Sequence, residues 1–107
     1  MRNLWSSSSH RQFALLGLCE SEDKLANYEQ ARDYCSRAIA YDPKEPMSYF
    51  LLGNVYRDMF NVTPQREYLI AARDNYSKMI AINPDLDVSS HAQNYVHQID
   101  QLLPQMK

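Results

Sequence analysis

Glycine is scarce in this chain: only two of its 107 residues are glycine, and five are proline. Proteins rich in strands and tight turns usually need more of both, because glycine supplies positive φ angles and proline fixes turn geometry. Residues that favour helices, such as Ala, Leu, Glu, Gln and Arg, are plentiful. The sequence therefore predicts an all-α protein, and its length suits a single domain over residues 1–107.

The chain also lacks a strong excess of charge and a long apolar run. Eleven Lys and Arg residues against thirteen Asp and Glu residues give a formal net charge of −2, so the positive surface that binds a phosphate backbone is missing. No segment approaches the roughly 20 apolar residues of a membrane span. Residues 1–9, which include four serines, lack the apolar segment of a signal peptide. We expect no nucleic-acid partner and no membrane span.

Cysteine is limited to Cys19 and Cys35, which do not form the Cys-x-x-Cys motif of a zinc or redox site. Small apolar residues of this kind pack well between helices, and we interpret both as reduced. Reduced thiols are typical of reducing compartments, so we expect a cytoplasmic protein.

Motifs for catalysis are missing as well. His91 and His97 are six residues apart and do not share a helix face as a metal-binding i, i+4 pair does. The chain has no glycine-rich phosphate loop and no nucleophile motif. We predict a protein that is not an enzyme, with no cofactor and no metal site.

What the chain does contain is an internal repeat. Residues 31–43 and 72–84 are identical at seven of thirteen positions, at an offset of 41. Upstream of these segments the offset is 36, where Phe13-x-x-Leu16-Gly17 matches Tyr49-x-x-Leu52-Gly53. The smaller offset indicates five extra residues inside the second unit.

Each unit has the apolar spacing of two helices. The second helix of each unit ends where Pro43 or Pro84 follows, since proline disfavours helical dihedrals in the residue before it. Thr63 and Pro64 predict a break inside the second unit, with Thr63 capping the next helix. One more helix is predicted over residues 88–103, because its apolar residues share a face.

This repeated pattern resembles the tetratricopeptide repeat (TPR), a helix-turn-helix unit of about 34 residues with the pattern Trp-x2-Leu-Gly-x2-Tyr, Ala-x3-Phe and Pro. The first unit, about residues 10–43, matches at Phe13, Leu16, Gly17, Ala31, Cys35 and Pro43. The second, about residues 46–84, matches at Tyr49, Leu52, Gly53, Tyr56, Ala72, Tyr76 and Pro84. The resemblance implies a right-handed α-α superhelix of two hairpins. The helix 88–103 is then either a C-terminal capping helix or the start of a third repeat.

The second unit departs from the family's spacing. From motif glycine to motif alanine there are 14 residues in the first unit (Gly17 to Ala31) and 19 in the second (Gly53 to Ala72), and both intervals are longer than is usual in the family. We attribute the excess to an insertion near residues 60–66 that lengthens both helices, and we expect the second hairpin to project beyond its neighbour. Each glycine is expected to make room for the following helix.

Proteins that resemble this family bind peptides or helices in a groove lined by the first helix of each repeat. The resemblance therefore implies a protein-protein interaction module whose groove contains Arg11, Ala14, Leu18, Met47, Phe50, Asn54, Arg57 and Asp58. We prefer Phe50 and Arg57 as anchors, because aromatic and arginine side chains are common hot spots. Phe60 and Tyr68, in the insertion, form a candidate second surface.

Two alternatives remain open. Repeat proteins generally need about three units to bury a continuous core, so the chain could instead be a homo-oligomerising structural domain that associates through Leu102, Leu103 and the insertion. Some small members of the family are secretion or assembly chaperones, which is the other alternative. The Lys and Asn with which one subfamily clamps the tails of heat-shock chaperones are replaced here by Ala14 and Leu18.

Overall fold

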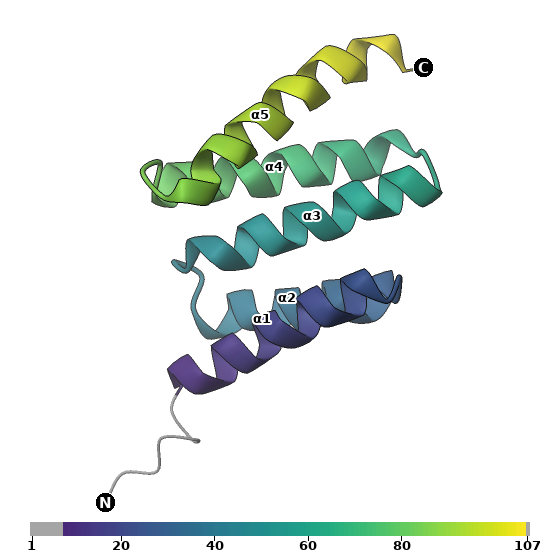
Figure 1. Cartoon of the computed structure of the whole chain (residues 1–107). Coiled ribbons are helices and arrows are strands. Elements are labelled where there is room, and N and C mark those ends of the chain that lie inside the picture. The colour runs from purple at the N-terminus through teal and green to yellow at the C-terminus, as the bar shows by residue number, and fades with distance from the viewer. Residues whose placement is uncertain (1–7, 107) are drawn as a thin grey trace, which may run out of the picture.

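The computed structural model describes residues 8–106 and is built from helices (Figure 1). The helices are α1 (Ser8–Lys24), α2 (Tyr28–Tyr41), α3 (Pro46–Val62), α4 (Arg66–Ile82) and α5 (Asp87–Leu102), followed by the 3-10 turn η2 (Leu103–Gln105). No strand occurs within this range, and the all-α prediction is confirmed. Residues 1–7 and 107, which the one-domain prediction includes, lie outside the described residues.

Neighbouring helices in the chain are also neighbours in space. Helix α1 packs on α2, α2 on α3, α3 on α4 and α4 on α5, and α1 also contacts α3. Figure 1 shows the helices as a stack that begins with α1 and α2 and ends with α5. Every helix within residues 8–106 is too short or too polar to cross a lipid bilayer.

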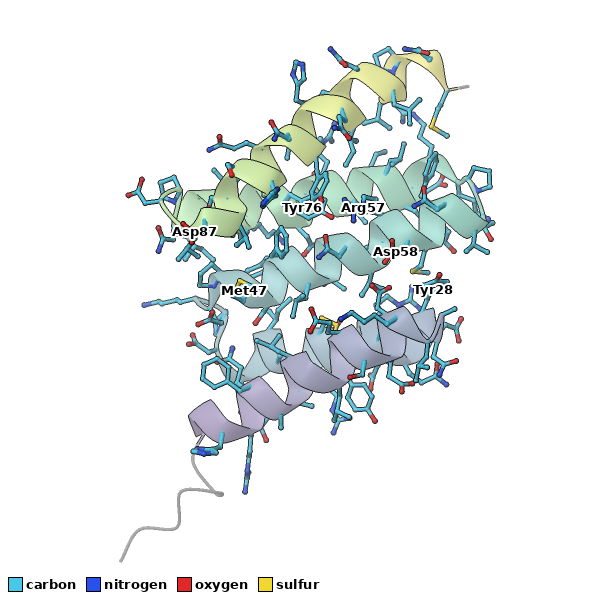
Figure 2. The ribbon with its side chains drawn as sticks, viewed as in Figure 1. Tyr28, Met47, Arg57, Asp58, Tyr76 and Asp87 are labelled. Atoms are coloured by element: carbon cyan, nitrogen blue, oxygen red, sulfur yellow. A yellow bond between two sulfur atoms is a disulfide. The ribbon has the colours of Figure 1, made fainter. Side chains whose placement is uncertain are left out.

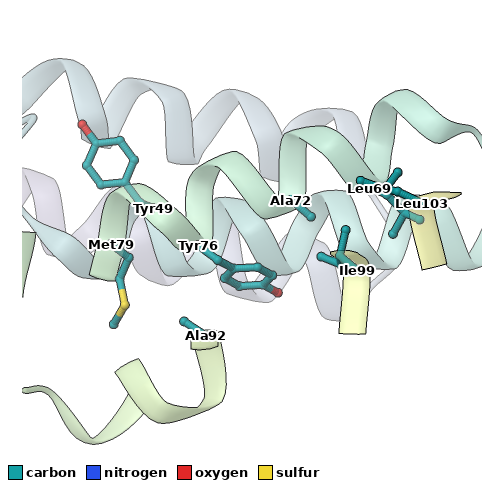
Figure 3. Close-up of a cluster of buried hydrophobic side chains, with 8 residues drawn as sticks. All are labelled: Tyr49, Leu69, Ala72, Tyr76, Met79, Ala92, Ile99 and Leu103. Carbon is teal, nitrogen blue, oxygen red and sulfur yellow. The ribbon is translucent and has the colours of Figure 1, made fainter. Parts of the chain in front are cut away.

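The largest buried cluster joins α4 and α5 to the start of α3 (Figure 3). Its members are Tyr49, Leu69, Ala72, Tyr76, Met79, Ala92, Ile99 and Leu103. Leu103 was expected to contribute to a dimer surface, but it is buried in this cluster and only Leu102 beside it is exposed. A dimer surface that includes Leu103 is therefore contradicted.

The loops that follow α2 and α4 have the same local structure, as the repeat predicts. The Asp42 side chain accepts a hydrogen bond from the backbone N–H of Lys44 at 3.0 Å. The Asn83 side chain accepts one from the backbone N–H of Asp85 at 3.0 Å. Each Asx residue also caps the preceding helix and is followed by a proline, so both helices end at the same point of the repeat.

Gln12 is a buried polar residue that ties α1 to the next hairpin. Its Nε2 lies 3.2 Å from the carbonyl oxygen of Ala38, 3.3 Å from that of Asp42 and 3.4 Å from the hydroxyl oxygen of Ser48. These acceptors belong to the end of α2, the following loop and the start of α3. One amide group therefore stabilises the contact of three helices.

The prediction of two reduced cysteines is wrong, because Cys19 and Cys35 are joined in a disulfide (Figure 2). Their Cα atoms are 5.4 Å apart on α1 and α2, and both side chains are fully buried. The short turn between the helices brings the two residues opposite each other, which the lack of a Cys-x-x-Cys motif does not reveal. The cytoplasmic location inferred from reduced thiols loses this support.

The extra residues of the second hairpin are helical. Both hairpin loops have the same length, residues 25–27 and 63–65. Seven residues of α1 follow Gly17, against nine of α3 after Gly53, and three residues of α2 precede Ala31, against six of α4 before Ala72. The extra length is therefore shared by α3 and α4.

The expected N-cap at Thr63 is wrong. Thr63 ends α3, where its backbone N–H donates to Met59, and Gln65 occupies the N-cap of α4. Because Pro64 disfavours helical dihedrals in the residue before it, the chain stays extended at Thr63 and α4 begins three residues later.

Only one of the two glycines has the expected packing role. A Cβ atom at Gly53 would lie 2.7 Å from Cε1 of Tyr76, whereas one at Gly17 would meet nothing within 4 Å. The expectation that Gly17 makes room for the next helix is wrong, because this side of α1 is exposed.

Candidate partner-binding groove

Helix α3 presents one partly open face to solvent. Its opposite face is buried and consists of Ser48, Tyr49, Leu52, Gly53, Val55 and Met59. The five α3 residues predicted for the groove are all partly exposed: Met47, Phe50, Asn54, Arg57 and Asp58. Spacings of three and four residues place them on one face of the helix, so the structure brings these five together.

Tyr76 of α4 packs against the residues of this face. Its fully buried ring lies with its centroid 5.8 Å from that of Phe50 and 5.2 Å from that of Tyr95. Its hydroxyl group donates a hydrogen bond to Oδ1 of Asn54 at 2.5 Å. Burial raises the pKa of Tyr76, so the hydroxyl remains a donor at every physiological pH. Gly53 leaves the space that the ring occupies.

Arg57 connects α3 with α5. Its guanidinium carbon lies 4.0 Å from the centroid of the Tyr95 ring, within the range of a cation-π contact. Figure 2 shows Arg57 and Tyr76 close together in the middle of the molecule. Arg57 also lines two pockets, one on each side of α3.

The first of these, the apolar pocket, lies between α3, α4 and α5 and has a volume of about 180 Å³. It is lined by Arg57, Phe60, Asn61, Leu69, Tyr95, Gln98, Ile99 and Leu102. Aliphatic and aromatic carbon makes up most of this lining. The apolar pocket therefore suits one apolar side chain of a partner.

The second, the acidic pocket, lies between α1 and α3. Its lining residues are Glu20, Asp23, Lys24, Leu51, Asn54, Arg57 and Asp58. The pKa of Asp23 is raised from 3.8 to about 8, first by burial and then by the hydrogen bond and the charge of the neighbouring Asp58 carboxyl group. Oδ1 of Asp23 is buried without a hydrogen-bond partner among the described residues. A proton shared by the two carboxyl groups would satisfy this atom.

Arg11 and Leu18, the α1 residues predicted for the groove, do not line either pocket. Both are exposed. Two positions along a helix correspond to a rotation of about 200°, so Leu18 points away from Glu20. Helix α1 is turned so that Glu20, Asp23 and Lys24 approach α3 instead, and Arg11 and Leu18 lie outside both pockets.

Phe60 and Tyr68 do not share a surface. Both are only partly exposed. Phe60 lines the apolar pocket beside α5, whereas Tyr68 packs on Tyr56, with ring centroids 6.5 Å apart, and lines a pocket beside the start of α2. The predicted second surface is therefore divided between two sides of the α3–α4 hairpin.

Sequence reasoning missed the residues that α1 and α5 contribute to the pockets. The contact of Tyr95 on α5 with Arg57 on α3 depends on how these helices pack, which the sequence pattern does not specify. Asp23 offered a signal, since the offset of 36 aligns it with Met59, which is buried. A carboxyl group at a position that is apolar in the other repeat points to a specialised site.

Comparisons of the chain with protein-family models, with curated proteins and with solved structures found no match.

Proposed function

We propose that the chain is a protein-interaction module that binds a helix or an extended peptide of a partner protein across the open face of α3, without a catalytic step or a cofactor. The observation that carries the proposal is the position of Arg57, which lines both the apolar and the acidic pocket. Two pockets of different character on either side of one helix suit a ligand that spans both. A partly exposed arginine that packs on an aromatic ring is also a common binding hot spot.

The two pockets favour a particular kind of segment. An apolar side chain of the partner would enter the pocket beside α5. A hydrogen-bond-donating group would approach the carboxyl groups of Glu20 and Asp58 in the pocket beside α1, whose lining also includes Lys24 and Arg57. The charge of the partner's segment would then contribute more to the specificity of binding than to its affinity.

For the fold we propose the TPR-like superhelix that the repeat implies, with α5 as its cap. The matching Asx-Pro loops of the two hairpins support it, as does the packing of Tyr76 on Gly53. A third repeat would place His91 where the motif has a buried leucine, and His91 is exposed. The exposed Gln93 and Asn94 suit a helix whose outer face meets water.

A peptide library displayed on phage tests the function. Peptides selected on the wild-type protein should bind in calorimetry, and Phe50→Ala and Arg57→Ala should each weaken this binding at least tenfold, as hot-spot truncations do. Arg37→Ala is the matched control, because Arg37 also lies over a tyrosine ring, 5.6 Å from the centroid of Tyr34, but belongs to α2. Selected peptides that bind Arg57→Ala and Phe50→Ala with wild-type affinity would contradict the proposal.

A further inference from the structure

Helix α1 has an outward face that is apolar and uncovered within the described chain. Phe13 is 63% exposed, Leu18 43% and Leu25 68%. Helical spacing places small exposed residues between them, namely Ala14, Gly17 and Ser21. We call these six residues the α1 face.

The two ends of the helix stack differ in polarity. The outer side of α5 exposes Gln93, Asn94, His97 and Gln101, which is the polar surface that the ends of repeat stacks require. The α1 face at the other end is apolar. Gly17 in its centre destabilises the helix and makes no room for any residue of its own chain.

We propose that the α1 face is a homodimer interface, covered by the α1 face of a second copy that runs antiparallel about a two-fold axis near Gly17. Charge complementarity carries the choice of partner. Arg11 and Glu22 lie on the same edge of α1 as Leu18, because spacings of seven and four residues return to the same side of a helix. In an antiparallel pair related by a two-fold axis, this edge of one helix lies beside the same edge of the other helix, with the chain direction reversed. Arg11 of each copy therefore faces Glu22 of the other.

The same register also fits the sizes of the side chains. The midpoint between residues 11 and 22 lies beside Gly17, where the helices cross and the absence of a side chain permits a close approach. Phe13 of one copy then lies over Gly17 and Ser21 of the other, which leave space for its ring. A two-fold parallel pair would instead place this edge against the opposite edge of the α1 face, and Arg11 and Glu22 would not meet.

The inference does not rest on the proposed function, because Leu18 and Arg11 point away from the acidic pocket beside α3. One pair of 17-residue helices buries less than the roughly 1,200 Å² of a stable interface. We therefore expect weak association, with a dissociation constant of about 10 to 300 μM.

Sedimentation equilibrium of the whole chain from about 5 μM to 1 mM tests the proposal. Arg11→Glu and Glu22→Arg should each raise the dissociation constant at least about tenfold, because two attractive pairs become repulsive. An equimolar mixture of the two variants should recover dimers, since each mixed pair again joins opposite charges. Eleven residues of helix span about 16 Å, too far for Arg11 and Glu22 to pair within one chain.

The apolar contact is tested with a matched pair of variants. Phe13→Ser should also weaken the dimer about tenfold or more, whereas Val62→Ser should not, although Val62 is equally exposed at 65% on α3. Circular dichroism establishes that each variant is folded. A monomeric mass at 1 mM, a dimer that tolerates both Arg11→Glu and Phe13→Ser, or a mixture that fails to recover dimers would each overturn the proposal.

Discussion

Alanine at each of the two glycines should change stability in opposite directions. Both glycines lie inside helices, α1 and α3, so alanine gains about 1 kcal/mol of helix propensity at either position. At Gly17 the new methyl group meets nothing within 4 Å. Gly17→Ala should therefore raise the free energy of unfolding by close to this full amount, which corresponds to about 4–8 °C in melting temperature.

At Gly53 the gain is outweighed by steric overlap. The added Cβ would lie 2.7 Å from Cε1 and 2.8 Å from Cδ1 of Tyr76. This ring cannot move easily, because it is fully buried between Phe50 and Tyr95 and its hydroxyl group is bound to Asn54. Overpacking of a core costs about 1–3 kcal/mol, and a rigid ring calls for the upper part of this range. We expect a net loss of about 1–2 kcal/mol for Gly53→Ala.

Urea unfolding followed by circular dichroism measures both changes. Samples of about 0.5 μM keep nearly all of the chain monomeric at the expected dissociation constants. The control is the double variant Gly53→Ala, Tyr76→Leu, which removes the ring that the added Cβ would overlap. Gly53→Ala with Tyr76→Phe is unsuitable as a control because it keeps this ring. A Gly53→Ala protein that is stabilised as much as Gly17→Ala would refute the close packing of Tyr76 on Gly53.

Three further variants test the acidic pocket, the disulfide and the hydrogen bond between Tyr76 and Asn54. The raised pKa of Asp23, about 8 against an ordinary 3.8, means that the folded protein binds this proton more tightly than the unfolded chain, so the free energy of unfolding should fall as the pH rises from about 4 to about 8. Asp23→Asn should flatten this slope in urea titrations at pH 5 and pH 8, and an unchanged slope would exclude Asp23 as its source. Replacing Cys19 and Cys35 by alanine should cost about 3 kcal/mol, as expected for a loop of this length, and alkylation of the denatured wild-type chain without reductant should label no thiol in mass spectrometry. Tyr76→Phe leaves Asn54 without its donor and should cost about 1 kcal/mol of unfolding free energy, so a variant as stable as the wild type would argue against that hydrogen bond.

Helix positions could be predicted from the sequence where local chemistry decides them. The prolines after Asp42 and Asn83 end α2 and α4 regardless of tertiary packing, because the restriction acts on the neighbouring residue. Pro46 likewise begins α3, as a proline in the first helical turn should. The predicted start of α4 is wrong because Thr63 has the side chain of a cap but precedes a proline.

Contacts between helices could not be predicted in the same way. Phe13 and Tyr49 occupy the same position of the repeat, yet Tyr49 is 8% exposed and Phe13 63%. The motif specifies an apolar residue, but the neighbouring elements decide whether it is buried. Lys78 and Pro43 surround the Tyr49 ring and its hydroxyl group, and no described element does the same for Phe13.

The rotation of α1 explains several of these differences together. Cys19 and Gln12 both face inward, one bonded to Cys35 and the other to the end of α2. Since Gly17 and Cys19 are about 200° apart around the helix, fixing Cys19 against α2 turns Gly17 and Phe13 outward. The same rotation carries Asp23 toward α3 and creates the acidic pocket. In α3, by contrast, the motif glycine keeps its packing on α4, which leaves the predicted groove residues open. The disulfide therefore holds α1 in the rotation that leaves both the acidic pocket and the α1 face at the surface of the described chain.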